Sequence, residues 1–187
     1  MTNGIVRWAD TVASPWKNGG GVTRQLLSVP PAAEMGEFDW RISVADIEAS
    51  GEFSRFDGVQ RVFTVVEGGP LDLVVDGDTR AVPLRMPFAF SGAASVTCVL
   101  RDGHARALNV MTREGRCRAQ VSVVSIHGVQ ELEPRAGHEV VLVVLAGEVT
   151  VSGGEHEARL TAYDLVRVDA MIALSGDGEC AVIDIAR

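Results

Sequence analysis

The sequence predicts an all-β fold of the sandwich or barrel type. Three observations support this prediction: many short segments alternate apolar and polar residues, glycine-rich clusters separate them, and no long run carries apolar residues at helical spacing. With 187 residues, the chain can form one domain or two small fused modules. This length also buries a sizeable core without metal or disulfide staples.

The period-two segments define the expected strands, and the turn clusters define their limits. A hairpin turn is expected at residues 76–78, further turns at residues 67–70, 152–154 and 175–178, and one short helical turn at residues 30–34. The expected strands comprise residues 40–45, 62–68, 71–75, 121–126, 140–145, 149–151, 165–168 and 181–185.

A weak internal repeat indicates two modules. A strand that ends in a glycine turn precedes a second strand at Gly68, and the same order recurs at Gly147, 79 residues later. A strand–glycine–strand unit followed by another hairpin is typical of half a cupin barrel, and two copies indicate two stacked or fused barrels. We therefore expect an N-terminal cupin-like module at residues 1–115, which carries the pocket, and a C-terminal module at residues 116–187.

Composition excludes two classes of partner and indicates a compartment. A formal net charge of -8 makes nucleic acid and anionic membrane poor partners for the whole molecule. No basic segment followed by an apolar one begins the chain, and the longest apolar run, residues 140–146, is too short to span a bilayer. The three cysteines are widely spaced, so we expect buried free thiols and a cytoplasmic location.

Neither metal nor nucleophilic chemistry has a motif in this sequence. A metal-binding cupin needs two histidines one residue apart with a glutamate after them, whereas His104, His127, His138 and His156 are isolated. The serines lie in no G-x-S-x-G context, and the Gly19–Gly21 run lacks the lysine and helix of a phosphate loop. We expect no metal, no cofactor and no catalytic residue.

Four polar residues lie at strand positions that are expected to point inward: Arg41 and Ser43 share one strand face, Arg61 begins an apolar strand, and Asn109 lies between apolar neighbours. Each has an ordinary alternative, because an arginine can extend to the rim and an asparagine can satisfy backbone groups. Together they would form a carboxylate pocket, since the guanidinium fork matches a carboxylate.

The segment Trp16–Gly21 combines a tryptophan, Lys17, Asn18 and three glycines. Lys17 is the only lysine, the other 16 basic residues being arginine. Glycines permit close backbone approach to a ligand, to which Lys17 would add a point charge and Asn18 a donor and an acceptor. The alternatives are genomic base composition for the single lysine and a simple glycine turn for the loop.

These segments resemble the HutD/Ves family, strongly over about residues 5–113 and weakly beyond. At two positions before Asn109, Ala107 and Leu108 replace the acidic–aromatic pair of the family pattern, and Glu114 replaces an arginine. The motifs that carry the resemblance are residues 16–23, 38–45, 51–58 with Arg61, 87–92, and Asn109 with Met111.

The resemblance implies a metal-free bicupin that binds an anionic intermediate of histidine degradation, urocanate or formylglutamate, and modulates histidine utilisation, or a stress-induced protein of the Ves type. Ligand binding would involve Lys17, Asn18, Arg41, Ser43, Arg61 and Asn109. Two further hypotheses stay open. A metal-free enzyme would need an acid or base such as Asp57 or Glu67. A homodimer would use the apolar run of the second module.

Overall fold

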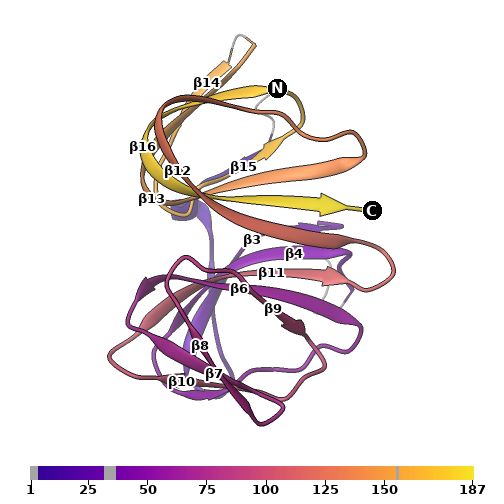
Figure 1. The fold of residues 1–187 in the computed structure, drawn as a ribbon, viewed down its shortest axis with the longest axis vertical. Coiled ribbons are helices and arrows are strands. Elements are labelled where there is room, and N and C mark those ends of the chain that lie inside the picture. The colour runs from indigo at the N-terminus through magenta and orange to yellow at the C-terminus, as the bar shows by residue number, and fades with distance from the viewer. Residues whose placement is uncertain (1–3, 32–36, 155) are drawn as a thin grey trace. The chain divides into compact units, whose positions relative to one another are not determined.

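A computed structural model describes residues 4–31, 37–154 and 156–187, and its fold is all-β (Figure 1). Over these residues the chain forms strands and one short 3-10 helix, η1 (Trp8–Asp10), which confirms the all-β class of the predicted fold. No helix among them has the length and apolar character needed to cross a membrane. Most of the predicted helical turn at residues 30–34 lies outside the described residues.

The chain divides into two compact units. The first unit comprises residues 12–118, and the second combines the N-terminal eleven residues with residues 119–187. The expected first module began at residue 1, but strand β1 (Ile5–Val6) pairs with β15 (Leu165–Val168) and therefore belongs to the second unit.

The first unit consists of a six-stranded and a four-stranded antiparallel sheet. The six-stranded sheet contains, in spatial order, β2 (Ala13–Pro15), β3 (Gly21–Val29), β4 (Trp40–Ile47), β11 (Ala105–Arg113), β6 (Val59–Gly68) and β9 (Phe88–Ser91). The four-stranded sheet contains β5 (Gly51–Glu52), β10 (Val96–Leu100), β7 (Leu71–Val75) and β8 (Asp78–Val82). An apolar core that includes Phe63, Val65, Leu71 and Leu73 fills the space between these sheets.

The second unit is one six-stranded sheet that curls around its own core (Figure 1). Its strands are β1, β15, β13 (His138–Gly153), β16 (Ile172–Ala186), β12 (Arg118–Leu132) and β14 (His156–Leu160), which pairs with β13. The apolar run 140–145 lies in β13 between β15 and β16 and is buried along its whole length, as a central strand requires.

Two predicted turns are in fact parts of continuous strands. β13 continues through Gly147, and β16 continues through residues 175–178, because these segments pair with each other. A Cβ on Gly176 would lie 2.5 Å from the carbonyl oxygen of Glu148. The glycines therefore permit close strand approach here, where the local sequence pattern predicts a turn. The turn at Asp76 and Gly77 is confirmed, with φ of 49° and 93° in the hairpin of β7 and β8.

The repeated glycines occupy equivalent positions in the two units. Gly68 has φ +93° and Gly147 has φ +72°, a region that favours glycine. A Cβ would lie 2.2 Å from the carbonyl oxygen of His104 in the first case and 2.3 Å from that of Asp177 in the second. Both glycines thus face a neighbouring strand at a distance that no side chain tolerates.

The strands before these glycines share two further details. Val66 and Leu145 are each skipped in the strand pairing, and they are 79 residues apart, as the glycines are. The carbonyl oxygen just before each bulge accepts a backbone hydrogen bond, from Arg85 in the first unit and from Tyr163 in the second. Both donors have positive φ, 64° and 68°. The two units therefore share one arrangement of strand, bulge and glycine, at Val66 and Gly68 in the first and at Leu145 and Gly147 in the second, which we call the strand frame.

Candidate functional site

Two neighbouring rows of side chains cross the six-stranded sheet of the first unit on the side of its core, and Gln25, at one end of the second row, is exposed. Residues directly opposite one another in antiparallel strands point to the same side of the sheet, and Phe63 and Phe90 identify this side as the core side. The first row consists of Ser28, Arg41, Met111, Arg61 and Phe90, and the second consists of Gln25, Ser43, Asn109, Phe63 and Phe88.

Arg61 is buried among aromatic rings, with 5% of its surface exposed. Its guanidinium carbon lies 5.0 Å from the centroid of Phe90, 5.2 Å from that of Phe53 and 5.9 Å from that of Phe56. One terminal nitrogen donates to the Asn109 amide oxygen at 2.9 Å. The buried Nε has no hydrogen-bond partner among the described residues, so part of the donor capacity of Arg61 is unused.

Arg41 is 7% exposed, and its orientation depends on a residue that the sequence analysis did not identify. Its Nε donates to the Gln25 amide oxygen at 2.7 Å, and the Gln25 amide nitrogen donates to the Ser28 hydroxyl at 3.1 Å. This chain fixes one edge of the Arg41 guanidinium. The terminal nitrogens remain available for a ligand.

Burial shifts the pKa of both arginines in the same direction. Desolvation lowers the pKa of Arg41, and desolvation with the nearby positive charge of Arg41 lowers the pKa of Arg61 to about 10. At neutral pH both guanidinium groups are still charged. Over the described residues, neither group forms an ion pair with a carboxylate. Two like charges are thus held in a buried place without a carboxylate partner among the described residues, which costs free energy in the folded protein.

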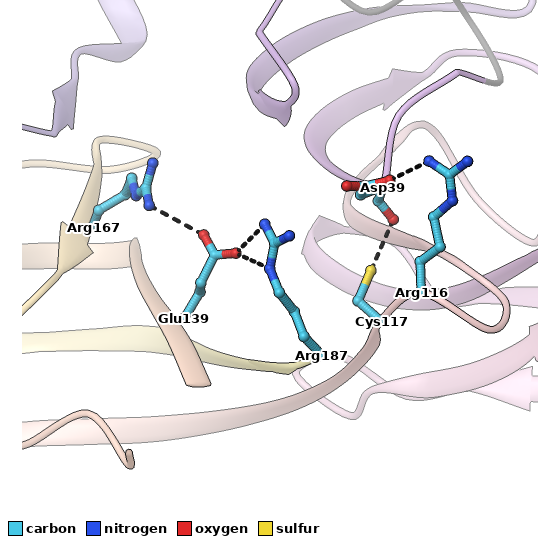
Figure 2. A network of polar contacts seen from close by, with 6 residues as sticks. All are labelled: Asp39, Arg116, Cys117, Glu139, Arg167 and Arg187. Atoms are coloured by element: carbon cyan, nitrogen blue, oxygen red, sulfur yellow. Dashed lines mark hydrogen bonds and ion pairs between the residues drawn. The ribbon is translucent and has the colours of Figure 1, made fainter. Parts of the chain in front are cut away.

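Met111 of the first row also belongs to a second apolar cluster, which contains Phe38 and Val59 and has Phe56 packed against it. The start of β4 is also tied to the end of β11 by polar contacts (Figure 2). The Asp39 carboxylate accepts a hydrogen bond from Arg116 at 2.7 Å, and the backbone carbonyl oxygen of Asp39 accepts one from the Cys117 thiol at 2.9 Å. These contacts hold the segment from which Arg41 projects.

The structure thus brings together Arg41, Ser43, Arg61 and Asn109, four of the six residues selected from the sequence. Ser43 is 2% and Asn109 6% exposed, and they are directly opposite each other on β4 and β11. Gln25, Ser28 and the phenylalanines around Arg61 were not predicted from the sequence. Gln25 is exposed on β3, and no local pattern marks it as a partner of Arg41.

Lys17 and Asn18 lie elsewhere, on the loop between β2 and β3. Both are exposed, and Gly21 at the end of this loop pairs with Ile47, at the opposite end of β4 from Arg41. The Asn18 side-chain oxygen accepts from the Gly20 backbone at 3.0 Å, which closes the turn. A Cβ on Gly21 would lie 2.2 Å from the carbonyl oxygen of Asp46, so this glycine is needed for strand approach.

Trp16 of the same loop is directed into the core of the first unit. Its indole nitrogen donates to the Thr23 hydroxyl at 2.7 Å, and its ring meets Phe53 edge-on at 6.1 Å. Through Phe53 the loop is packed toward the aromatic surroundings of Arg61.

The acid–base candidates lie outside this arrangement. Asp57 is exposed, and Glu67 is half exposed and accepts from Arg106 at 2.9 Å. Within the described parts of the chain, no group of three or more His, Cys, Asp or Glu side chains is placed to hold a metal ion. The arrangement presents hydrogen-bond donors and positive charge, which is the chemistry of anion binding.

Comparison with known proteins decides the family. The sequence model of HutD matches residues 8–183. The chain belongs to the HutD family. It is 36% identical, over 97% of its length and 96% of the relative, to an uncharacterised 21.2 kDa protein in the hutC 3′ region of Pseudomonas putida. Protein Ves of Citrobacter koseri is 44% identical over 58% of this chain and 56% of Ves.

Solved structures agree with this assignment. HutD of Pseudomonas fluorescens, solved in a formate condition, is 36% identical, with a TM-score of 0.83 over 97% of each chain. A protein of unknown function from Pseudomonas aeruginosa has a TM-score of 0.89 at 30% identity over 98% of each chain. Escherichia coli YlbA shares only the fold, with a TM-score of 0.75 at 11% identity over 96% of this chain and 89% of YlbA. The fold of this HutD-family chain is thus all-β and cupin-like.

Proposed function

We propose that the first unit of this HutD-family protein is a cupin barrel that binds a small carboxylate without catalysis. The observation that carries the proposal is the pair of buried arginines, Arg41 and Arg61, without a carboxylate partner among the described residues. A carboxylate ligand would supply the missing counter-charge and accept from the unused guanidinium nitrogens. Asn109 would contact the same ligand from β11, between the strands of the two arginines, and Ser43 from β4, the strand of Arg41.

The proposed ligand is an intermediate of histidine degradation, urocanate or formylglutamate, and binding would modulate histidine utilisation. Both compounds are carboxylates, urocanate with one such group and formylglutamate with two. The phenylalanines around Arg61 suit a ligand with a flat or apolar part beside its carboxylate. We further propose that the second unit is the other barrel of a bicupin, because both units share the bulge and glycine positions.

Titration calorimetry with urocanate and with formylglutamate tests the ligand class. We expect saturable heat from at least one compound and none from their uncharged esters. A folded protein that gives no heat with either carboxylate contradicts the ligand assignment. Conversion of either compound to a product, followed by chromatography, would contradict the non-catalytic role.

Arg61→Ala tests the site directly. We expect the dissociation constant to rise about tenfold or more, the equivalent of about 1.4 kcal/mol, because one charge-assisted contact is lost. Arg80→Ala is the matched control: this arginine lies on β8 of the same unit, with a side chain 61% exposed. An equal effect of the two substitutions would remove Arg61 from the site.

A further inference from the structure

The second unit has an open cavity of about 240 Å³. Leu132, Val140 and Val182 give it an apolar lining, and Glu133, Arg135 and Asp184 give it charged groups. Gln120 and Ser122 of β12 add neutral polar groups. Its volume is below the roughly 300–1,000 Å³ of sites for drug-sized ligands, so its occupant would be small.

This cavity lies at the position in the second unit that corresponds to the buried Arg61 of the first. Val140 follows Arg61 by 79 residues, the spacing of the equivalent glycines. Arg61 is opposite Met111 on β11, and Val140 is opposite Asp184 on β16. At corresponding places on the strand frame, the first unit thus has a buried cation and the second has an apolar residue beside a carboxylate.

The charged groups of the cavity are partly compensated. Asp184 contacts the Nδ1 of His138 and lies 3.8 Å from Arg135, while 22% of its side chain is still exposed. Glu133 is exposed and makes no ion pair with any residue that the structure describes. Arg135 is 75% exposed in its side chain and directed at Asp184. The lining of the cavity thus has two carboxylates, Glu133 and Asp184, and one arginine.

The strand that carries Asp184 is held in place independently of the cavity. Glu139, beside His138, accepts from Arg167 at 3.1 Å and from the terminal Arg187 at 2.8 Å and 3.0 Å (Figure 2). These contacts tie the end of β16 to β13. The pairing of β13 with β16 is therefore stabilised by contacts that do not involve the Asp184 carboxylate.

We propose that this cavity binds a small organic cation that has one ammonium group and a short apolar part. The ammonium group would lie between Glu133 and Asp184, with Gln120 or Ser122 accepting a further hydrogen bond, and the apolar part would cover Val140 and Val182. An anion would be repelled by both carboxylates and attracted only by the exposed Arg135. This inference does not depend on ligand binding in the first unit.

Methyl NMR of the full chain with three matched probes tests the proposal. The probes are n-butylammonium, 1-butanol and butyrate, which share an apolar chain and differ in charge. We expect saturable shifts of the Val140 and Val182 methyl signals with n-butylammonium, at a dissociation constant at least about threefold below that of butanol, the size of one exposed charge interaction. We expect weaker or no shifts with butyrate.

Glu133→Gln should raise the dissociation constant of n-butylammonium about threefold, because it removes the unpaired carboxylate and keeps the side-chain shape. Glu157→Gln on β14 is the control, an exposed acid of the same unit away from the cavity lining. The proposal is overturned if no probe gives saturable shifts, if butanol or butyrate binds as well as n-butylammonium, or if the two substitutions have equal effects. Arg61→Ala should leave these shifts unchanged.

Discussion

The buried Arg61 of the first unit and the cavity of the second lie at corresponding places on one strand frame, and they differ in charge: Arg61 is a cation, whereas the cavity lining has two carboxylates and one arginine. Gly68 and Gly147, with the bulges before them, maintain the frame in both units. At the position of Arg61 the second unit has Val140, and opposite it Asp184 replaces Met111. The bulge and glycine positions are thus common to the two units, and the residues that differ are a few inward side chains on the same strands.

Substitution of the two glycines of the strand frame is expected to have the largest effect on stability. Gly68→Ala and Gly147→Ala each combine positive φ with a Cβ less than 2.5 Å from a backbone carbonyl oxygen. Because a neighbouring strand has to shift, we expect each to lower the free energy of unfolding by about 2–4 kcal/mol, measured by urea denaturation.

Gly77→Ala is the control for strain alone, since φ is +93° but no atom lies within 4 Å of the added Cβ. Its cost should be about 1 kcal/mol. If all three glycine substitutions cost the same, close strand approach does not maintain the frame.

The buried charge of Arg61 lowers the stability of the folded protein, and Arg61→Met should reveal this cost. Methionine keeps much of the volume among Phe53, Phe56 and Phe90 and removes a buried charge whose pKa is lowered to about 10 by desolvation and by Arg41. We expect the free energy of unfolding without ligand to rise by about 1 kcal/mol, after the loss of the Asn109 hydrogen bond is subtracted. Carboxylate binding should be lost in the same variant.

The outcome that contradicts this expectation is a variant that unfolds more easily and binds no carboxylate, because Arg61 would then be a structural residue. Arg80→Met, at an exposed site, should change neither stability nor binding. If Arg61→Met is more stable than the original protein and no longer binds the carboxylate, the charge of Arg61 serves binding and not stability.

Local alternation was sufficient to predict the parts of the fold that pair with near neighbours. The strand Leu71–Val75 has the predicted limits, and Asp76–Gly77 forms the predicted hairpin turn. The inward direction of Arg41 and Arg61 also follows from alternation, because every second residue points to the core. These features need no knowledge of the distant sequence.

Features set by distant pairing could not be predicted in this way. Residues 175–178 have the composition of a turn, yet they lie in a strand because residues 147–150 lie beside them. Gln25 and Ser28 are three residues apart, and they share a face of the sheet only because of the register shift between Gln25 and Leu27. A register shift changes which side chains share a face, and it leaves no mark in the local pattern.

Gln25 therefore provides a sharper test of the pocket than the residues found by alternation. Gln25→Leu removes the acceptor of Arg41 Nε and keeps a side chain of similar size. We expect carboxylate binding to weaken about fivefold, which is about 1 kcal/mol and the net worth of one typical hydrogen bond, with little change in stability. The dissociation constant from calorimetry measures this effect.

A double-substitution cycle gives the control for Gln25. If Gln25 acts through Arg41, then Gln25→Leu should have no further effect in an Arg41→Met background. Additive effects of the two substitutions would place Gln25 in direct contact with the ligand or outside the site.

The smallest effect is expected at the single lysine. Lys17→Arg keeps the charge and changes the shape, and Lys17 is exposed on a loop at the opposite end of β4 from Arg41. We expect the dissociation constant for the carboxylate to change less than about twofold, because a charge screened by water contributes little. A loss of tenfold would place Lys17 at the ligand and extend the site from the arginine rows to the Trp16 loop. The glycines around Lys17 would then serve ligand approach in addition to strand approach.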